Sequence, residues 1–380
     1  MAENVTRTVI VIGAGASKDF SKKGSSESIG MPTGEGLVSE MAKFEEEIGA
    51  EKDRNTEHDL ESLNHKLNPY FHYHLIIVKL LKFYDPVSID SFLSSLERGL
   101  ISINVADIHL KNESEDRKKL VQAGKELITF CLLKAEDKNI FNIDNKIWYR
   151  WLREAIIGGS LSENQDSNNK RSAEQIILDK INRLQIINFN YDRSFSFYLS
   201  QKMNQGIKIG EEIRNIYDEI RAKIYHPYGD LAKNESFSQL SYGELDEKLK
   251  NTDLKNIFNE IIKPFSENIR IIGEERIDDN NVGNKIKEEI DTVQKNTSQD
   301  RKQSFYFLGF GFIEENMKQI SSQTTFNCSR KIFYTNYGNS GKINNSIEKL
   351  TSSSLRDENG TKSSNKGVYD ALNEDFSLII

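Results

Sequence analysis

The sequence predicts an α/β protein with a Rossmann-like parallel sheet and a mostly helical inserted subdomain. Short apolar segments typical of buried strands are spread along the chain, from Thr8–Ile12 to Lys331–Asn336. Longer segments with helical periodicity or high charge separate them, as expected for parallel strands joined by helical crossovers. We therefore expect strands from both ends of the chain to meet in one sheet.

The composition limits the class of protein. A hydrophobic content of 37% is enough for a core, and 380 residues can form one large domain or two. The two cysteines, Cys131 and Cys328, stand far apart, so we expect neither a disulfide framework nor a metal site. Low cysteine use and the lack of a secretory signal favour a reducing cytoplasm. A net charge of −7 without a basic stripe argues against direct nucleic-acid binding, and no apolar run is long enough for a membrane span.

The first strand, Thr8–Ile12, runs into the turn Gly13-Ala14-Gly15-Ala16-Ser17. Glycines let a phosphate approach the backbone, and a helix starting near Ser17 would offer N–H groups to an anion. Lys18 stands where the dinucleotide-binding fingerprint has its third glycine. A dehydrogenase would also need an acid that closes a strand about 20 residues later, and none is obvious. A phosphate loop and a simple packing turn therefore both fit this segment.

The region from about Gly36 to Gly158 is expected to be mostly helical. Apolar residues recur at three- and four-residue spacing in Leu75–Tyr84 and in Ser88–Leu100, where Ser88 is placed to cap a helix. A loop rich in turn-forming residues follows at Ser160–Ser172.

A second strand is predicted at Leu184–Phe189, and polar residues alternate after it. Asn188, Asn190 and Asp192 would face the same way in an extended segment, at the carboxyl end of the strand. Open α/β sheets bind ligands at that end. The alternative is a polar connection in which Asp192 or Ser194 caps the next helix.

A third extended segment, Lys223–Leu231, contains His226 and Tyr228 before the turn residue Gly229. Of six histidines, only His226 stands beside a strand-turn signal, although a lone histidine is more often structural. Residues 244–302 are charged and expected to be helical in part, with a break at Asp278–Asn284.

The last third of the chain predicts two more strands and a loop. Ser304–Phe312 ends in Gly309-Phe310-Gly311, where a flat ring or a ribose could rest, or where the chain simply packs. Lys331–Asn336 is a further strand, and Ser352–Lys366 is expected to be a polar loop.

Taken in order, these segments resemble the sirtuin-like family. The motifs that carry the resemblance are Gly13-Ala14-Gly15-Ala16-Ser17, Asn190-Tyr191-Asp192, His226-Pro227-Tyr228-Gly229, Gly309-Phe310-Gly311 and Asn336. They frame the chain from about residue 9 to about residue 336. The resemblance implies a single sirtuin-like unit over 1–380, with a Rossmann-like core from about 1–38, 181–243 and 303–380. It implies a helical insertion at about 39–180 and a charged helical insertion at about 244–302.

Differences from the protein deacylases indicate which members of the sirtuin-like family the chain resembles. The four-cysteine zinc module of protein deacylases cannot form here, and Met31–Val38 replaces their Ile-Pro-Asp-Phe-Arg run. With the SIDSFL segment, these features are similar to the zinc-less sirtuin-like NAD hydrolases of bacterial antiphage defence. In those proteins the histidine commonly precedes the glycine directly, where this chain has Tyr228. His226 is therefore expected to take the functional role, with Tyr228 as its competitor.

The resemblance implies an NAD+ glycohydrolase that yields nicotinamide and ADP-ribose and acts by depleting NAD+. Asn190 would position the nicotinamide ribose or the water, Asp192 would accept a hydrogen bond from the carboxamide, and His226 would contact ribose hydroxyls or act as a base. The remaining residues assigned to NAD+ are Gly13, Ala14, Gly15 and Ser17 at the pyrophosphate, Gly309, Phe310, Gly311 and Asn336 at the adenosine ribose, and Tyr228.

Two other functions remain open: a non-catalytic module that senses NAD or ADP-ribose, and an NAD-dependent ADP-ribosyltransferase. A free NAD hydrolase would be toxic to its own cell, so its activity would be gated by self-assembly or by a second protein. The resemblance implies a HerA-type ring ATPase as the partner, with an Argonaute-type partner as the alternative.

Overall fold

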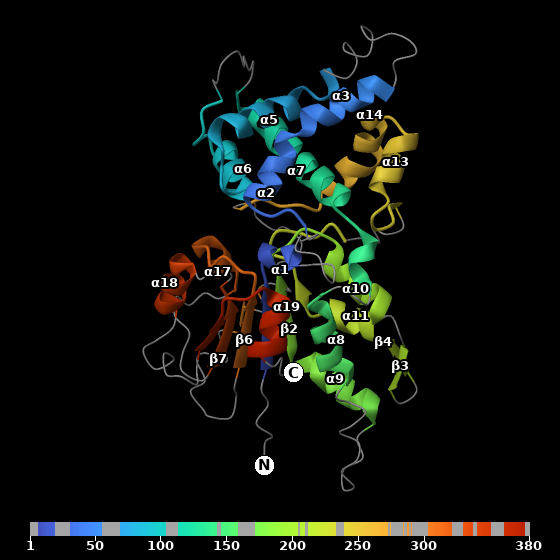
Figure 1. Ribbon diagram of the computed structural model, residues 1–380, viewed down its shortest axis with the longest axis vertical. Coiled ribbons are helices and arrows are strands. Elements are labelled where there is room, and N and C mark those ends of the chain that lie inside the picture. Colours follow the sequence, from blue (N-terminus) through green and yellow to red (C-terminus); the bar gives the residue numbers. More distant parts are fainter. Residues whose placement is uncertain are drawn as a thin grey trace.

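A six-stranded, all-parallel sheet forms the core of the computed structural model (Figure 1). In sheet order the strands are β5 (Ile224–Tyr225), β2 (Leu184–Asn188), β1 (Arg7–Ile12), β6 (Gln303–Leu308), β7 (Arg330–Thr335) and β8 (Thr361–Ser364). The structure describes residues 7–19, 31–54, 69–103, 113–142, 146–158, 172–203, 206–209, 212–232, 239–272, 274, 284, 287–288, 290, 303–320, 330–336, 340–350 and 361–376. The predicted α/β class with a Rossmann-like parallel sheet is confirmed.

Strand β1 lies at the centre because apolar side chains fill both of its faces. Val9 and Val11 belong to one buried cluster, whereas Ile10 and Ile12 belong to a second cluster on the opposite face. Parallel pairing joins Thr8 to Leu184 on one side of β1 and to Ser304 on the other. Strands from the two ends of the chain therefore meet next to each other.

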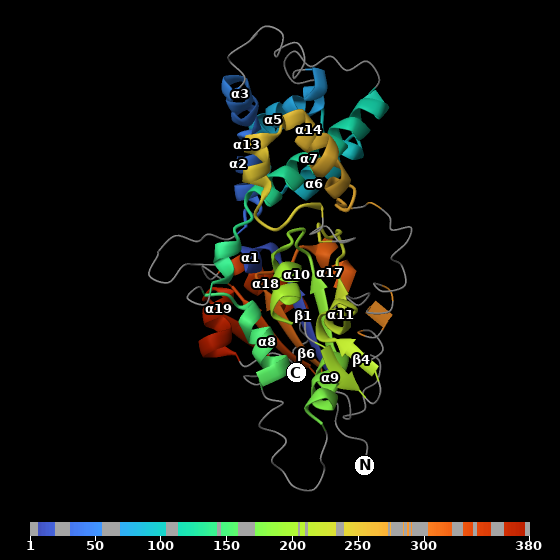
Figure 2. The ribbon, with the colours of Figure 1, turned by 90° about the vertical axis from the view of Figure 1, so that its right-hand side faces the viewer.

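Helices cover both faces of the sheet (Figure 2). Helices α17 (Glu314–Ile320) and α18 (Gly341–Leu350) contribute Ile320 and Ile347 to the cluster that contains Val9. The other face carries α8 (Tyr149–Ile157), α9 (Ala173–Arg183), α10 (Ser194–Lys202), α11 (Ile216–Arg221), α19 (Val368–Asp370) and the π-helix η6 (Ala371–Asp375).

Two helices near the expected end of the first insertion, residue 180, pack on the sheet. Helix α8 lies within the expected insertion 39–180 and α9 crosses its end, and Leu152 of α8 and Leu178 of α9 are buried in the same cluster as Ile10. Both helices are amphipathic crossover helices that lead into β2, which places their apolar side against the strands.

The other inserted helices form a separate layer over the carboxyl ends of the strands (Figure 1). Its central helix is α7 (Glu113–Lys134), with 22 residues, and helices from both insertions pack against it. The layer consists of α2 (Glu35–Ala42), α3 (Phe44–Arg54), α5 (His72–Tyr84), α6 (Ile89–Glu97), α7 (Glu113–Lys134), α13 (Leu245–Asn251), α14 (Leu254–Ile257), the π-helix η4 (Phe258–Ile262) and α15 (Lys263–Ser266). We call this layer the helical subdomain.

A buried ion pair joins the helical subdomain to the sheet. Arg193, before α10, donates from Nε and Nη2 to the two carboxyl oxygens of Glu136 at 2.7 and 2.6 Å. Both side chains are fully buried, and Glu136 also accepts the Gly243 N–H at 3.0 Å. Because a bidentate pair fixes both position and angle, it sets how the segment after β2 meets the end of α7.

The structure confirms the predicted helix cap at Ser88 and contradicts part of a predicted loop. Ser88 caps α6 as predicted, because its Oγ accepts the N–H of Ser91. The prediction of a loop over Ser352–Lys366 was wrong for Thr361–Ser364, because these residues form the edge strand β8. Edge strands can be short and polar because pairing with one neighbour holds them. The hairpin of β3 (Gly206–Ile209) and β4 (Glu212–Asn215) was not predicted.

Other expectations fall partly or wholly on parts of the chain that the structure does not describe. They are most of the loop Ser160–Ser172, the break Asp278–Asn284 and Cys328. Among the described helices, none is long and apolar enough to cross a membrane.

Candidate functional site

The turn after β1 packs directly on the turn after β6. The N–H groups of Gly13 and Gly15 donate to the carbonyls of Leu308 (2.9 Å) and Gly309 (3.0 Å). Gly309 has a φ of +58°, and a Cβ on Gly13 would lie 2.5 Å from its carbonyl oxygen. The glycines at these positions therefore serve close backbone packing, and two of the N–H groups assigned to a pyrophosphate are bonded within the protein.

Ser17 connects the two predicted polar segments. It lies in the short helix α1 (Ala14–Lys18) and is 2% exposed, and its Oγ accepts a hydrogen bond of 2.7 Å from Asn190 Nδ2. The Ser17 hydroxyl also acts on the carboxyl of Asp192 and on the hydroxyl of Tyr149 in α8, where it opposes the rise in pKa that burial causes. The structure thus brings Ser17, Asn190 and Asp192 together at the carboxyl ends of β1 and β2.

Asn190 carries a buried amide oxygen that lacks a donor. The residue is 6% exposed, and no described residue donates to Oδ1, while Nδ2 is used by Ser17. Its backbone N–H donates to Asn188 Oδ1 at 3.1 Å, which fixes the bend after the strand. Because an unpaired buried oxygen costs about 1–3 kcal/mol, this atom is suited to receive an N–H or O–H group of a ligand.

Asp192 is both a helix-start residue and a member of this group. Its Oδ1 accepts the N–H of Ser194, the first residue of α10, at 3.0 Å. Asp192 therefore helps to start this helix, which is part of what the alternative of a helix cap predicted. Burial raises the pKa of its carboxyl, hydrogen bonds from Ser194 and Ser17 lower it, and the charge of Asp230 raises it further. A carboxyl with such a pKa can hold a proton more readily than an exposed aspartate.

A small cavity of about 80 Å³ lies beside these residues, between the sheet and the helical subdomain. It is lined by Ala14, Ser17, Met31, Pro32, Thr33, Gly34, Leu37, Ser88, Ile89, Asp90, Leu132, Phe189, Asn190, Tyr191 and Asp192. We call it the Asn190 cavity. Pockets for whole ligands usually hold about 300–1,000 Å³, so this cavity matches one ring-sized part of a ligand.

Asp90 of α6 is a site residue that the sequence reasoning missed. It lines the Asn190 cavity, and Tyr191 Oη lies 2.5 Å from its Oδ1 and 2.8 Å from the carbonyl oxygen of Arg270. Burial raises the pKa of Asp90 to about 6, although the hydrogen bond with Tyr191 lowers it. In the sequence Asp90 is only an acidic residue in the first turn of the helix that Ser88 caps, and nothing there marks it as a site residue.

His226 and Tyr228 stand outside the lining of the Asn190 cavity. His226 Nε2 lies 3.6 Å from Asp230 Oδ2, and the charge of Asp230 in turn acts on Asp192. Tyr228 is buried and donates to Asn316 Oδ1 at 2.5 Å, and burial raises its pKa. Gly229, with φ +90°, holds this turn against the backbone of Asn268. Asp230 is therefore the residue that interacts with both His226 and Asp192.

The residues assigned to the adenosine ribose are used mainly for structure. Phe310 is 2% exposed and packs on Phe189 with ring centroids 5.1 Å apart, whereas Gly311 is exposed. Asn336 donates from Nδ2 to the carbonyl of Ser340 (3.1 Å) and to Asn344 Oδ1 (2.8 Å), and its Oδ1 accepts the Ser340 N–H. These bonds hold the start of α18.

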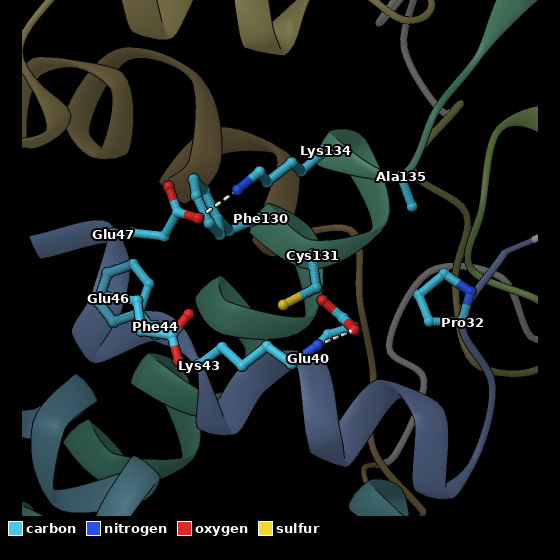
Figure 3. A pocket seen from close by; sticks show the side chains of 10 residues that line it. All are labelled: Pro32, Glu40, Lys43, Phe44, Glu46, Glu47, Phe130, Cys131, Lys134 and Ala135. Carbon is cyan, nitrogen blue, oxygen red and sulfur yellow. Dashed lines mark hydrogen bonds and ion pairs between the residues drawn. The ribbon is translucent and has the colours of Figure 1, made fainter. Parts of the chain in front are cut away.

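A second, open hollow of about 520 Å³ lies between α2, α3 and α7 (Figure 3). Charged side chains at its rim pair with each other, as Lys43 does with Glu40 at 2.7 Å and Lys134 with Glu47. Its sulfur-bearing residue is Cys131, and burial raises the pKa of that thiol to about 12. The thiol is therefore protonated at neutral pH and is a poor nucleophile.

No His, Cys, Asp and Glu cluster of metal-binding size occurs in the described ranges. No protein-family model matches the chain. A search of curated proteins also finds no match.

Proposed function

We propose that the protein hydrolyses NAD+ to nicotinamide and ADP-ribose. The observation that carries the proposal is the buried Oδ1 of Asn190, which has no donor among the described residues and lies beside Ser17 and Asp192 in the lining of a cavity. This group stands at the carboxyl ends of parallel strands, where open α/β sheets bind ligands. The resemblance of its motifs to sirtuin-like NAD hydrolases supports the same substrate.

The reaction needs stabilisation of a sugar cation more than acid catalysis. Water oxygen attacks C1′ of the nicotinamide ribose as the C1′–N bond breaks. The bonding electrons pass to the pyridinium nitrogen, which leaves as neutral nicotinamide, and the water loses a proton. Asn190 can orient either the ribose or the water, because a carboxamide both donates and accepts. The carboxyls of Asp192 and Asp90 would favour the positive charge that develops on the ribosyl group as the C1′–N bond breaks.

The size of the Asn190 cavity suits the nicotinamide ring rather than the whole dinucleotide. At about 80 Å³ it leaves the rest of NAD+ outside. Since the N–H groups of Gly13 and Gly15 donate to Leu308 and Gly309, the phosphate role would fall to other groups of the opening turn.

The test is the release of nicotinamide from NAD+ by the purified chain, measured by chromatography. We expect Asn190→Ala to lower kcat by at least about 100-fold, because Asn190 positions the reacting groups. Asn251→Ala, at an exposed position on α13, is the matched control and should keep wild-type activity. Full activity of Asn190→Ala, or no nicotinamide from the wild type either alone or with the product of its neighbouring gene, would overturn the proposal.

A second candidate is a module that binds NAD or ADP-ribose without turnover. The observation that favours it is the position of His226, which is not among the residues that line the Asn190 cavity. Saturable binding of NAD+ with no nicotinamide release would establish this alternative.

The biological role also follows from the resemblance. We propose an effector that depletes NAD+ in antiphage defence, in the cytoplasm, gated by self-assembly or by a HerA-type ring ATPase, with an Argonaute-type protein as the other partner. Mass measurement of the chain alone and with the product of its neighbouring gene tests this proposal. A chain that stays monomeric and does not bind the product of the neighbouring gene would contradict this proposal.

A further inference from the structure

The helical subdomain completes the wall of the Asn190 cavity. Ser88, Ile89 and Asp90 line it from the subdomain, whereas Asn190 and Asp192 line it from the sheet. The position of Asp90 is well defined, since the cap at Ser88 starts α6 and Ile89 is 2% exposed. A ligand held by Asn190 would therefore also meet a carboxyl group from the helical subdomain.

Asp90 has bonding capacity left for a ligand. Its Oδ1 pairs with Tyr191 Oη at 2.5 Å, and the described part of the chain supplies no further hydrogen bond to its carboxyl. A deprotonated carboxylate can accept about four hydrogen bonds through its two oxygens. At neutral pH Asp90 is thus an acceptor with an unused oxygen at the cavity.

Three groups in the lining of the cavity can accept hydrogen bonds from a ligand. Asn190 contributes the unpaired Oδ1, and Asp90 and Asp192 contribute carboxyl groups, while the lining contains no lysine or arginine among the described residues. A primary carboxamide presents two N–H donors to such a wall. A carboxylate in the same place presents no donor and adds a like charge.

We propose that Asp90 determines specificity by accepting an N–H of the nicotinamide carboxamide, so that the site selects NAD+ over nicotinic acid adenine dinucleotide. The inference rests on the proposed NAD+ site, and it adds a residue from the inserted subdomain to it. Asp192 accepts the second N–H of the amide group, and Asn190 remains near the reacting carbon.

The substitution Asp90→Asn tests the role with little change of shape. The asparagine keeps an acceptor for Tyr191, removes the charge and offers an N–H₂ group to a carboxylate. We expect the wild type to prefer NAD+ over nicotinic acid adenine dinucleotide by about 100-fold or more in kcat/KM, and Asp90→Asn to reduce this ratio to about 10-fold or less. Asp85→Asn, five residues earlier on the surface, is the matched control and should keep the wild-type ratio.

Tyr191→Phe separates a direct role from a positioning role. It removes the hydrogen bond at Asp90 but leaves the carboxylate in the cavity wall, so the preference for NAD+ should persist. If Tyr191→Phe loses discrimination as fully as Asp90→Asn does, Asp90 acts through Tyr191 and the direct role is wrong.

A binding measurement keeps this inference separate from the proposed hydrolysis. Nicotinamide and nicotinic acid are added to the full chain at pH 7.5, and their binding is followed by ligand-observed NMR. Selective binding of nicotinamide that Asp90→Asn relaxes supports the inference even if NAD+ is not hydrolysed. Unchanged discrimination in Asp90→Asn, or no binding of nicotinamide by the wild type, overturns it whether or not NAD+ is consumed.

Discussion

Asn190 Nδ2 donates a hydrogen bond of 2.7 Å to Ser17 Oγ, between residues 173 positions apart in the sequence. The bond joins the segment after β1 to the segment after β2, which are neighbours because β1 and β2 pair in parallel. In this arrangement Nδ2 of Asn190 faces Ser17 and Oδ1 is left for a ligand.

Removal of the Ser17 hydroxyl should weaken the site. Ser17→Ala takes away the acceptor for Asn190 Nδ2, so Asn190 becomes free to turn its amide. We expect kcat for NAD+ to fall by about 10- to 100-fold and the free energy of unfolding to fall by about 1–2 kcal/mol. Ser200→Ala, on α10, removes a hydroxyl that bonds only to its own helix and should leave kcat unchanged. Wild-type kcat in Ser17→Ala would show that the contact is not needed.

The turn after β6 should tolerate no side chain at Gly309. A Cβ there would lie 2.0 Å from the backbone nitrogen of Ala16, at a φ of +58°. We expect Gly309→Ala to lower the free energy of unfolding by about 3 kcal/mol or more, measured by urea denaturation. Gly311→Ala is the matched control, since its Cβ would meet only Ile313 at 3.9 Å, and it should cost less than about 1 kcal/mol. Equal stability of the two variants would contradict the packing described here.

The buried pair of Arg193 and Glu136 should show strong coupling. Arg193→Met leaves the Glu136 carboxylate buried with only the Gly243 N–H, so we expect a loss of about 3–5 kcal/mol in the free energy of unfolding. The double variant Arg193→Met/Glu136→Gln should lose less than the sum of the two single variants, because it buries no unpaired charge. Urea denaturation of the four proteins measures the coupling, and simple additivity would count against the pair.

The stability contributed by Asp90 should depend on pH. Its pKa rises from 3.8 to about 6 on folding, so the folded state favours the neutral carboxyl. The contribution is fully present below about pH 3.8 and is lost as the pH rises through about 6. The neighbouring tyrosines Tyr191 and Tyr228 stay neutral in this range, because burial raises their pKa values.

Asp90→Asn cannot ionise, so between pH 4.5 and pH 7.5 it should gain about 2 kcal/mol of stability relative to the wild type. Urea denaturation at the two pH values measures the change, and Asp85→Asn accounts for the loss of one surface charge. A difference between Asp90→Asn and wild type that is the same at both pH values would contradict the raised pKa.

Much of the sheet was predictable because buried parallel strands are continuous apolar runs. Thr8–Ile12 and Leu184–Phe189 fall within one residue of strands β1 and β2. Strand β8 and the hairpin of β3 and β4 were not predictable in this way. Thr361–Ser364 is polar and becomes a strand only by pairing with β7. Asp90 was missed for a related reason, since a helix far along the chain contributes to the cavity only after the subdomain packs over the sheet.

The sequence by itself determined the α/β class, the positions of buried strands along the chain and the polar groups that follow these strands. These features depend on periodicity, turn residues and alternation, which are local. Tertiary structure alone decided that Gly13 and Gly15 pack on Gly309, that Asn190 bonds to Ser17, and that His226 stands outside the cavity that Asp90 lines. Each of these contacts joins segments far apart in the chain, so its geometry comes from the pairing of the strands and the packing of the helical subdomain above them.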